Sequence, residues 1–136
     1  MIVRQRKVAE RFWLSVVLLA GQLLIAGLYL FPGFLAPPRP TTTVVVVALG
    51  QVGPIWTVWF GGTGLALLWA LVTHRLLHVA HTATASSWLG FAFALVVGAV
   101  ATGGTYLLPV ASLLLGAVNL VVAASYSRDE GRGRPE

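Results

Sequence analysis

The chain has 136 residues, of which 57% are hydrophobic and only 10% charged. Soluble domains carry about 25% charged residues, so this composition excludes a small water-soluble domain and predicts an integral membrane protein. The net charge of +5 lies at the chain ends and in loops, which excludes a nucleic-acid-binding face and favours contact with anionic lipid at the membrane surface. The absence of cysteine from the sequence excludes disulfides and thiolate metal ligands.

The N-terminal region is a basic head followed by an apolar run. Residues 1–11, MIVRQRKVAER, carry four basic residues, and residues 12–31 form an uncharged run of 20 residues, which is about the length that crosses a hydrocarbon core. A signal peptide has the same order of regions, but its apolar part is only about 7–15 residues long. Because this run is longer and further spans follow, we expect an uncleaved first transmembrane helix at 12–31.

A proline-rich loop separates the first span from the second. The stretch 43–52 that follows contains four consecutive valines, and we expect it at the outer membrane interface, because a lone strand in lipid would leave its backbone unpaired. Pro54 suits the first turn of a helix, so the second span is predicted at 54–73. The prolines that rule out a helix through the loop are Pro32, Pro37, Pro38 and Pro40.

The second half of the chain contains two more apolar runs. Residues 82–87, TATASS, predict a polar loop in which Ser86 or Ser87 caps a third span at 88–102. The GGTY turn leads to a fourth span at 107–125, and the charged tail at 127–136 is expected to be mobile. The sequence therefore predicts an all-α integral membrane protein, with four transmembrane helices arranged as two hairpins in a domain covering 12–126.

The basic residues predict the orientation of these spans. The head, the loop with Arg75 and the tail would lie on one side of the membrane, whereas only Arg39 would lie on the other. By the positive-inside rule, both termini are expected in the cytoplasm and the chain as a multi-pass protein of the inner (plasma) membrane. The expected interface anchors are the tryptophans near span ends: Trp13 and Trp88 at the cytoplasmic side, and Trp56 and Trp59 at the outer side.

All three histidines lie in the stretch HRLLHVAH. His74, His78 and His81 are four and three residues apart, so a continuing helix would place them on one face. Three neutral imidazoles can bind zinc, but the stretch offers no carboxylate or thiol and the nearby Arg75 disfavours another cation. We favour a structural or interfacial role without a cofactor; pH-sensitive contact with lipid or a partner, and a metal site, are the alternatives.

Small residues recur every four positions in the third span and again in the fourth. In lipid such stripes seat another helix at short distance, so they predict either packing within one chain or self-association. The GGTG at 61–64 lacks the Lys-Ser/Thr of a phosphate-binding loop and is interpreted as a helix-packing feature too. The stripe residues are Gly90, Ala94, Gly98 and Thr102, with Ser112 and Gly116 in the fourth span.

Polar residues inside the predicted spans are few and uncharged. We expect Gln22, Thr63 and Asn119 to form hydrogen bonds between helices or to face a pore. The predicted spans contain no Asp, Glu, Lys or Arg, which argues against a pump, an ion-coupled transporter or a voltage sensor. All acidic residues lie in terminal segments and no serine has an evident base and orienting group, so we expect a non-enzyme.

The whole layout resembles small multi-spanning proteins of actinobacterial bacteriophages, some of which are holins or holin-like. The features that carry the resemblance are the basic MIVRQRKVAER head, four short uncharged spans, the tight ATGGTYLLP hairpin and the charged SRDEGRGRPE tail. The resemblance implies a homo-oligomer that permeabilises the inner membrane for phage lysis and has no catalytic residues. The competing interpretation is an accessory subunit, or an interaction or exclusion protein, that binds a membrane-protein partner and forms no pore.

Overall fold

The computed structural model describes residues 2–30, 54–103 and 106–132. These residues form four helices, α1 (Ile2–Leu30), α3 (Ile55–Thr73), α4 (Leu77–Thr102) and α5 (Leu107–Arg132), and no strand occurs among them. Each helix contains a segment long and apolar enough to cross a membrane: Ala9–Leu30, Ile55–Thr73, Leu77–Ala101 and Leu107–Arg128. The predicted all-α architecture with four spanning helices is confirmed, and the chain is a small polytopic membrane protein.

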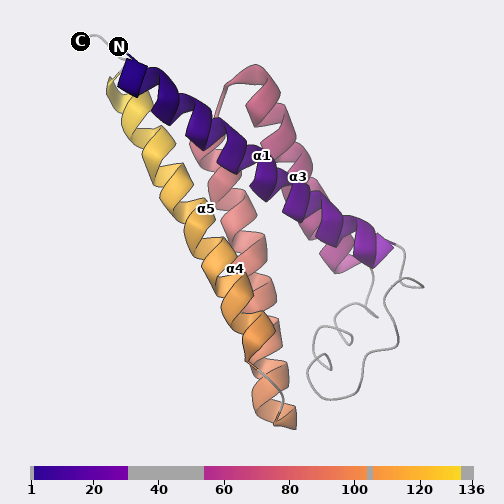
Figure 1. Ribbon diagram of the computed structural model, residues 1–136. Coiled ribbons are helices and arrows are strands. Elements are labelled where there is room, and N and C mark those ends of the chain that lie inside the picture. The colour runs from indigo at the N-terminus through magenta and orange to yellow at the C-terminus, as the bar shows by residue number, and fades with distance from the viewer. Residues whose placement is uncertain (1, 31–53, 104–105, 133–136) are drawn as a thin grey trace.

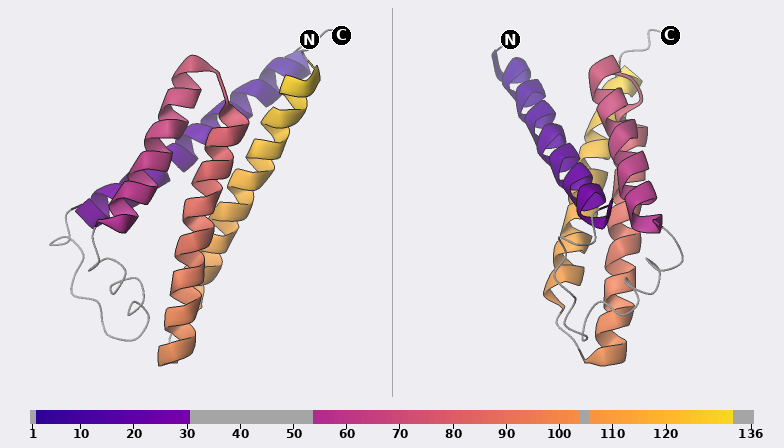
Figure 2. Two further views of the ribbon diagram at one scale, coloured as in Figure 1. Left: turned by 180° about the vertical axis from the view of Figure 1, so that it is seen from behind. Right: turned by 90° about the vertical axis from the view of Figure 1, so that its right-hand side faces the viewer.

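The four helices alternate in direction and pack as two antiparallel pairs (Figure 1). Helix α1 lies along α3, and α4 lies along α5, with further contact between α3 and α4. The start of α1, the end of α5 and the turn between α3 and α4 share one end of the molecule, called here the terminal end (Figures 1 and 2). Away from that end the two pairs diverge, and the α4–α5 pair extends beyond the other (Figure 2).

A tight reversal joins α3 to α4. Both His74 and Leu76 have left-handed backbone angles, with φ of 53° and 54°, a conformation that residues other than glycine adopt rarely. Helix α4 therefore begins at Leu77, well before the predicted start at residue 88. Consequently the prediction of a polar loop at 82–87 is wrong, since these residues lie inside α4.

The two serines proposed as helix caps lie within α4 instead. Ser86 donates its hydroxyl proton to the carbonyl of Ala83 at 2.6 Å, and Ser87 to that of Thr84 at 2.8 Å. Short hydroxyl side chains satisfy themselves in this way within a helix, which is why a polar TATASS stretch need not be a loop. Helix α4 ends where the GGTY turn was predicted to begin. Gly103 has φ 66°, in the left-handed region, and its N–H bonds to the carbonyl of Ala99, which is a common way for a helix to end. Residues 104 and 105 lie outside the described residues.

The terminal segments are more helical than the sequence predicts. Helix α1 begins at Ile2, so the basic head forms its first turns. Helix α5 continues to Arg132, so the part of the expected mobile tail from 127 to 132 is helical. The predicted interfacial stretch 43–52 and the last residues of the tail, 133–136, lie outside the described residues.

Two apolar clusters fill the interior of the bundle. The aromatic cluster lies farther from the terminal end. In it, Phe60 contacts Trp88 and Phe91 edge to face, at ring-centroid distances of 5.1 and 5.5 Å. The aliphatic cluster lies nearer the terminal end and comprises Leu19, Leu67, Ala70, Leu71, Leu77 and Ala80. Large apolar side chains on all four helices are exposed, as expected where lipid is the solvent.

Candidate functional site

Polar side chains from all four helices converge inside the bundle, along a line called here the polar seam. Most of these side chains are fully buried, and several of them form hydrogen bonds with side chains of another span. The seam consists of Ser15 and Gln22 from α1, Thr63 from α3, His81, Thr84 and Ser87 from α4, and Asn119 and Tyr126 from α5.

The first node of the seam joins α1, α4 and α5 through the imidazole of His81. Its Nε2 lies 2.9 Å from Ser15 Oγ, and its Nδ1 lies 3.0 Å from Asn119 Oδ1. The Nδ2 of Asn119 donates to the carbonyl of Leu115 at 2.9 Å, which fixes the orientation of the amide. Because an amide oxygen only accepts, Nδ1 carries the ring proton and Nε2 is the acceptor in the neutral imidazole.

The hydroxyl of Ser15 has three neighbours. Its single proton has two acceptors within reach, His81 Nε2 and the carbonyl of Arg11 at 3.0 Å. The Tyr126 hydroxyl lies 3.4 Å from Ser15 Oγ, and the Tyr126 ring stacks on the imidazole with centroids 5.8 Å apart and planes 12° apart. The Arg11 guanidinium also reaches the carbonyl of Ser125 at 3.5 Å, so this node is where α1 is joined to α5.

The order Ser15–His81–Asn119 is that of a nucleophile, a base and an orienting group. The expectation that no serine has such partners is therefore wrong for Ser15, because its partner imidazole lies 66 residues away on another helix. Ser15 and His81 are both 0% exposed, which keeps a substrate away from the hydroxyl in this arrangement. As it stands, the node is a hydrogen-bonded connection between three spans.

The second node joins α1, α3 and α4 through Gln22. Its Nε2 donates to Thr63 Oγ1 at 2.5 Å and to Ser87 Oγ at 2.7 Å. Both hydroxyls direct their own protons to backbone carbonyls, at Trp59 and Thr84, each at 2.8 Å, so they present lone pairs to the amide nitrogen. The Gln22 Oε1 points elsewhere and has no hydrogen-bond partner among the described residues.

The sequence prediction identified only part of the seam. Gln22, Thr63 and Asn119 were expected between helices and lie there, whereas the roles of Ser15, Thr84, Ser87 and Tyr126 were missed. Their spacing carried a usable signal: Ser15 and Gln22 are seven residues apart, as are Asn119 and Tyr126, and the α4 members recur every three residues. These intervals keep the side chains on one helix face.

The three histidines do not form the predicted stripe, because α3 ends at Thr73 and the chain reverses before α4. His74 is exposed in the turn, His78 is half-buried near the start of α4, and His81 is fully buried in the seam. Within the described part of the chain, no group of three or more His, Cys, Asp or Glu side chains is placed to hold a metal ion.

The small-residue stripe is used inside this chain. A Cβ at Gly90 would lie 2.6 Å from Trp59 Cη2 of α3, and a Cβ at Gly116 would lie 2.8 Å from Leu89 Cδ2 of α4. These contacts correspond to the first of the two interpretations, packing within one chain. The side chain of Thr102 lies outside the described part. The other stripe residues are also buried: Ala94, Gly98 and Ser112.

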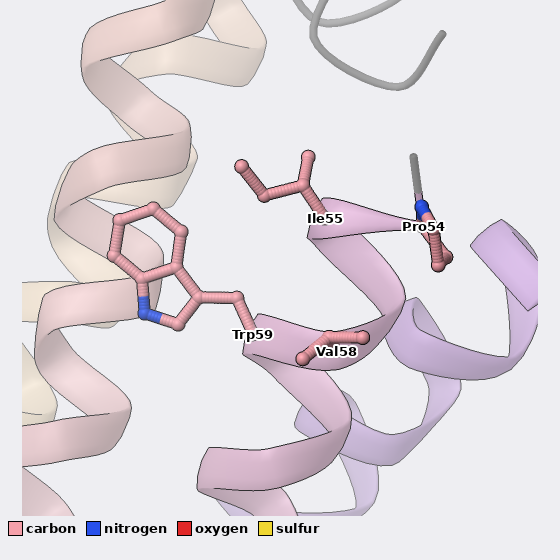
Figure 3. A pocket seen from close by; sticks show the side chains of 4 residues that line it. All are labelled: Pro54, Ile55, Val58 and Trp59. Carbon is pink, nitrogen blue, oxygen red and sulfur yellow. The ribbon is translucent and has the colours of Figure 1, made fainter. Parts of the chain in front are cut away.

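Two of the four expected interface tryptophans lie in the core. Trp56 is only 3% exposed and Trp88 belongs with it to the aromatic cluster, whereas Trp13 is 65% exposed. Trp59 is at the surface and reaches from α3 towards the neighbouring helix (Figure 3). With Pro54, Ile55 and Val58 it lines an open recess of about 480 Å³ whose lining suits apolar contact rather than a polar ligand.

No protein-family model matches the chain, and no curated protein or solved structure matches it.

Within the chain, backbone contact is closest inside each helix pair, and α1 approaches α5 at few positions. Side-chain contacts connect α1 to α4: the hydrogen bonds of Ser15 and Gln22, and the edge-to-face contact of Tyr29 with Phe91, whose ring centroids are 6.1 Å apart.

Proposed function

We propose that this chain is a non-enzymatic protein of the holin type, which self-associates in the inner membrane and permeabilises it for phage lysis. The observation that supports the proposal is the polar seam, in which polar side chains of all four spans are turned away from lipid. In this proposal the terminal end faces the cytoplasm, and the basic residues of α1 contact anionic headgroups there.

A water-filled lesion needs helices with a polar face, yet every span of this sequence is apolar around most of its circumference. The seam offers a source for such a face. If the α1–α3 pair separated from the α4–α5 pair, groups such as Gln22 and Ser87 would turn towards water, while the apolar exterior stayed in lipid. The four-helix unit described above is then the closed state of the protein.

The closed state is held by bonds of modest strength. Hydrogen bonds between membrane helices are worth about 0.6–2 kcal/mol each, and water or a neighbouring copy could replace those of Gln22 and Ser15. Separation is therefore expected to be favourable only when several copies meet and share the newly exposed faces. This dependence on association supports a lesion that forms abruptly once the protein reaches a sufficient density.

The test is inducible expression in a bacterial host, with membrane potential and culture density recorded. Since the chain contains no cysteine, a reversible lock between the pairs can be placed by joining Gln22→Cys and Ser87→Cys with a short membrane-permeant bis-methanethiosulfonate cross-linker. The native side chains meet end to end, with Gln22 Nε2 2.7 Å from Ser87 Oγ, and the linker spans the gap left by the shorter cysteine, which a direct disulfide would not bridge. Leu89→Cys with Gly116→Cys is the matched control, because it links α4 to α5 within one pair.

After treatment with the cross-linker, the α1–α4 lock should prevent or delay depolarisation, and a reductant should restore it. The control lock should leave depolarisation unchanged. Depolarisation with the α1–α4 lock fully formed would rule out separation of the pairs. Continued growth with the unlocked protein correctly inserted would rule out the holin function itself.

The alternative function is an accessory or interaction protein of a membrane complex, without pore activity. The observation that favours it is the open apolar recess beside Trp59, which could seat an apolar partner helix. This function predicts harmless expression and a partner that is isolated with the chain in fixed stoichiometry after detergent extraction.

A further inference from the structure

We propose that the His81 node is a binding site for one proton, and that proton binding loosens α1 from the α4–α5 pair. Only the biological purpose of this loosening rests on the proposed function, because proton binding and helix separation are measured independently of lysis. The side chains around His81 fix which ring nitrogen donates a hydrogen bond and which accepts one.

In the neutral node both ring nitrogens of His81 and the Ser15 hydroxyl have hydrogen-bond partners. The Nδ1–H of His81 donates to Asn119 Oδ1 at 3.0 Å, and the Ser15 hydroxyl donates to Nε2 at 2.9 Å. The lone pair on Nε2 is therefore the position at which a proton would add. It faces an oxygen rather than a hydrocarbon side chain.

The same atoms can satisfy the protonated ring without moving. After a proton has bound to Nε2, that nitrogen donates to Ser15 Oγ, and the Ser15 hydroxyl turns its own proton to the Arg11 carbonyl at 3.0 Å. The Tyr126 ring, stacked at 5.8 Å, offers its π face to the cation. The node thus offers hydrogen-bond partners to both ring nitrogens in either protonation state.

The charge itself, however, is poorly accommodated in the closed bundle. Both nitrogens of His81 bond to neutral groups, and the ring is fully buried. The titratable and charged side chains at this level are Glu10 and Arg11 on α1, His78 on α4, and Tyr126 and Arg128 on α5, whereas α3 contributes the apolar Leu67, Ala70 and Leu71.

A buried charge with neutral ligands is costly. Movement of α1 away from α4 and α5 would admit water to the imidazolium. The separated state therefore binds the proton more tightly than the closed state, and by linkage acidification favours separation. A rise in cytoplasmic proton concentration would act on the same seam that is proposed to open.

The experiment uses the purified full chain in lipid nanodiscs, with spin labels on two lipid-facing positions, Leu24→Cys on α1 and Leu114→Cys on α5. The distance between the labels is measured by pulsed electron paramagnetic resonance from about pH 8 to about pH 5, the range in which histidine changes charge. The test variant is His81→Gln, and the matched control is His74→Gln in the exposed turn.

We expect the label distance to increase on acidification in the parent protein and in His74→Gln, and to stay constant in His81→Gln. In a second variant, Asn119→Asp, a carboxylate beside Nδ1 gives the imidazolium a charged ligand in the closed bundle. Acidification should then no longer favour separation, and the increase in label distance should shrink or disappear. Circular dichroism and size-exclusion chromatography report whether each variant is folded.

A distance that does not change with pH in the parent protein would overturn the proposal, as would a His81→Gln response equal to that of the parent. A folded Asn119→Asp variant whose label distance increases on acidification as much as in the parent protein would also overturn it, which keeps the test decisive if His81→Gln does not fold. Acid-driven separation in a protein that never depolarises cells would support the proton site while overturning the holin function.

Discussion

The two buried amides of the seam differ in how completely their polar atoms are paired. Asn119 uses both ends, with Oδ1 on His81 and Nδ2 on the Leu115 carbonyl. Gln22 uses Nε2 only, and Oε1 has no partner among the described residues. An unmade hydrogen bond in a buried site costs more than a formed one contributes, so the two amides should respond differently to replacement.

Replacing Asn119 by Leu would leave the Nδ1–H of His81 without an acceptor, and we expect the free energy of unfolding to fall by about 1–3 kcal/mol. Replacing Gln22 by Met removes an unpaired oxygen, and Thr63 and Ser87 keep their backbone acceptors, so a loss within about 1 kcal/mol is expected. Denaturant titration in mixed micelles measures both values, and equal losses would contradict this account of the seam.

A single sequence predicts which polar residues lie inside a span, but not which of them contact one another. Gln22 and Asn119 were identified because a buried amide in lipid requires a partner. The Ser15–His81 bond could not be predicted, since it depends on the rotation and relative height of α1 and α4. No periodicity within either helix fixes those two quantities.

Among the helices, α4 is the element whose extent was least predictable. Its first eleven residues, LHVAHTATASS, include the stretch 82–87 that was predicted as a polar loop, yet all eleven are helical and bring His81, Thr84 and Ser87 into the seam. The hydroxyls bond to carbonyls of their own helix, and the imidazole bonds to α1 and α5.

The contact between α4 and α5 depends on close approach at Gly116. A Cβ there would lie 2.8 Å from Leu89 Cδ2 and 3.6 Å from the Ala85 carbonyl oxygen. We expect Gly116→Leu to lower the free energy of unfolding by about 1–3 kcal/mol through overpacking.

Gly62 on α3 is the matched position, because a Cβ there has nothing within 4 Å. Gly62→Leu should have little effect in the same micelle titration. Similar losses in the two variants would show that glycine at 116 is not needed for the approach of the two helices.

For the whole molecule, the number of spans was predictable because lipid imposes both the length and the apolar character of each crossing. The expected spans at 12–31, 54–73 and 107–125 lie within or at the bounds of α1, α3 and α5. The tilt of the two pairs and their divergence from the terminal end (Figure 2) were not predictable, since they follow from side-chain packing between helices.

The whole molecule also sets the condition that the proposed function must meet, which is exposure of the seam when the membrane becomes permeable. Ser87 is fully buried at the second node, whereas Leu65 on α3 faces outward. Cysteine at either position introduces a single thiol into a chain that has none. The reactivity of that thiol then reports whether its position meets water.

The most direct measurement is labelling of Ser87→Cys and Leu65→Cys in cells with a membrane-impermeant thiol reagent, before and after induced depolarisation. We expect Ser87→Cys to be unreactive before depolarisation and reactive after it, with Leu65→Cys unreactive throughout because it stays in lipid. Depolarisation that leaves Ser87→Cys unreactive would contradict a lesion lined by the polar seam.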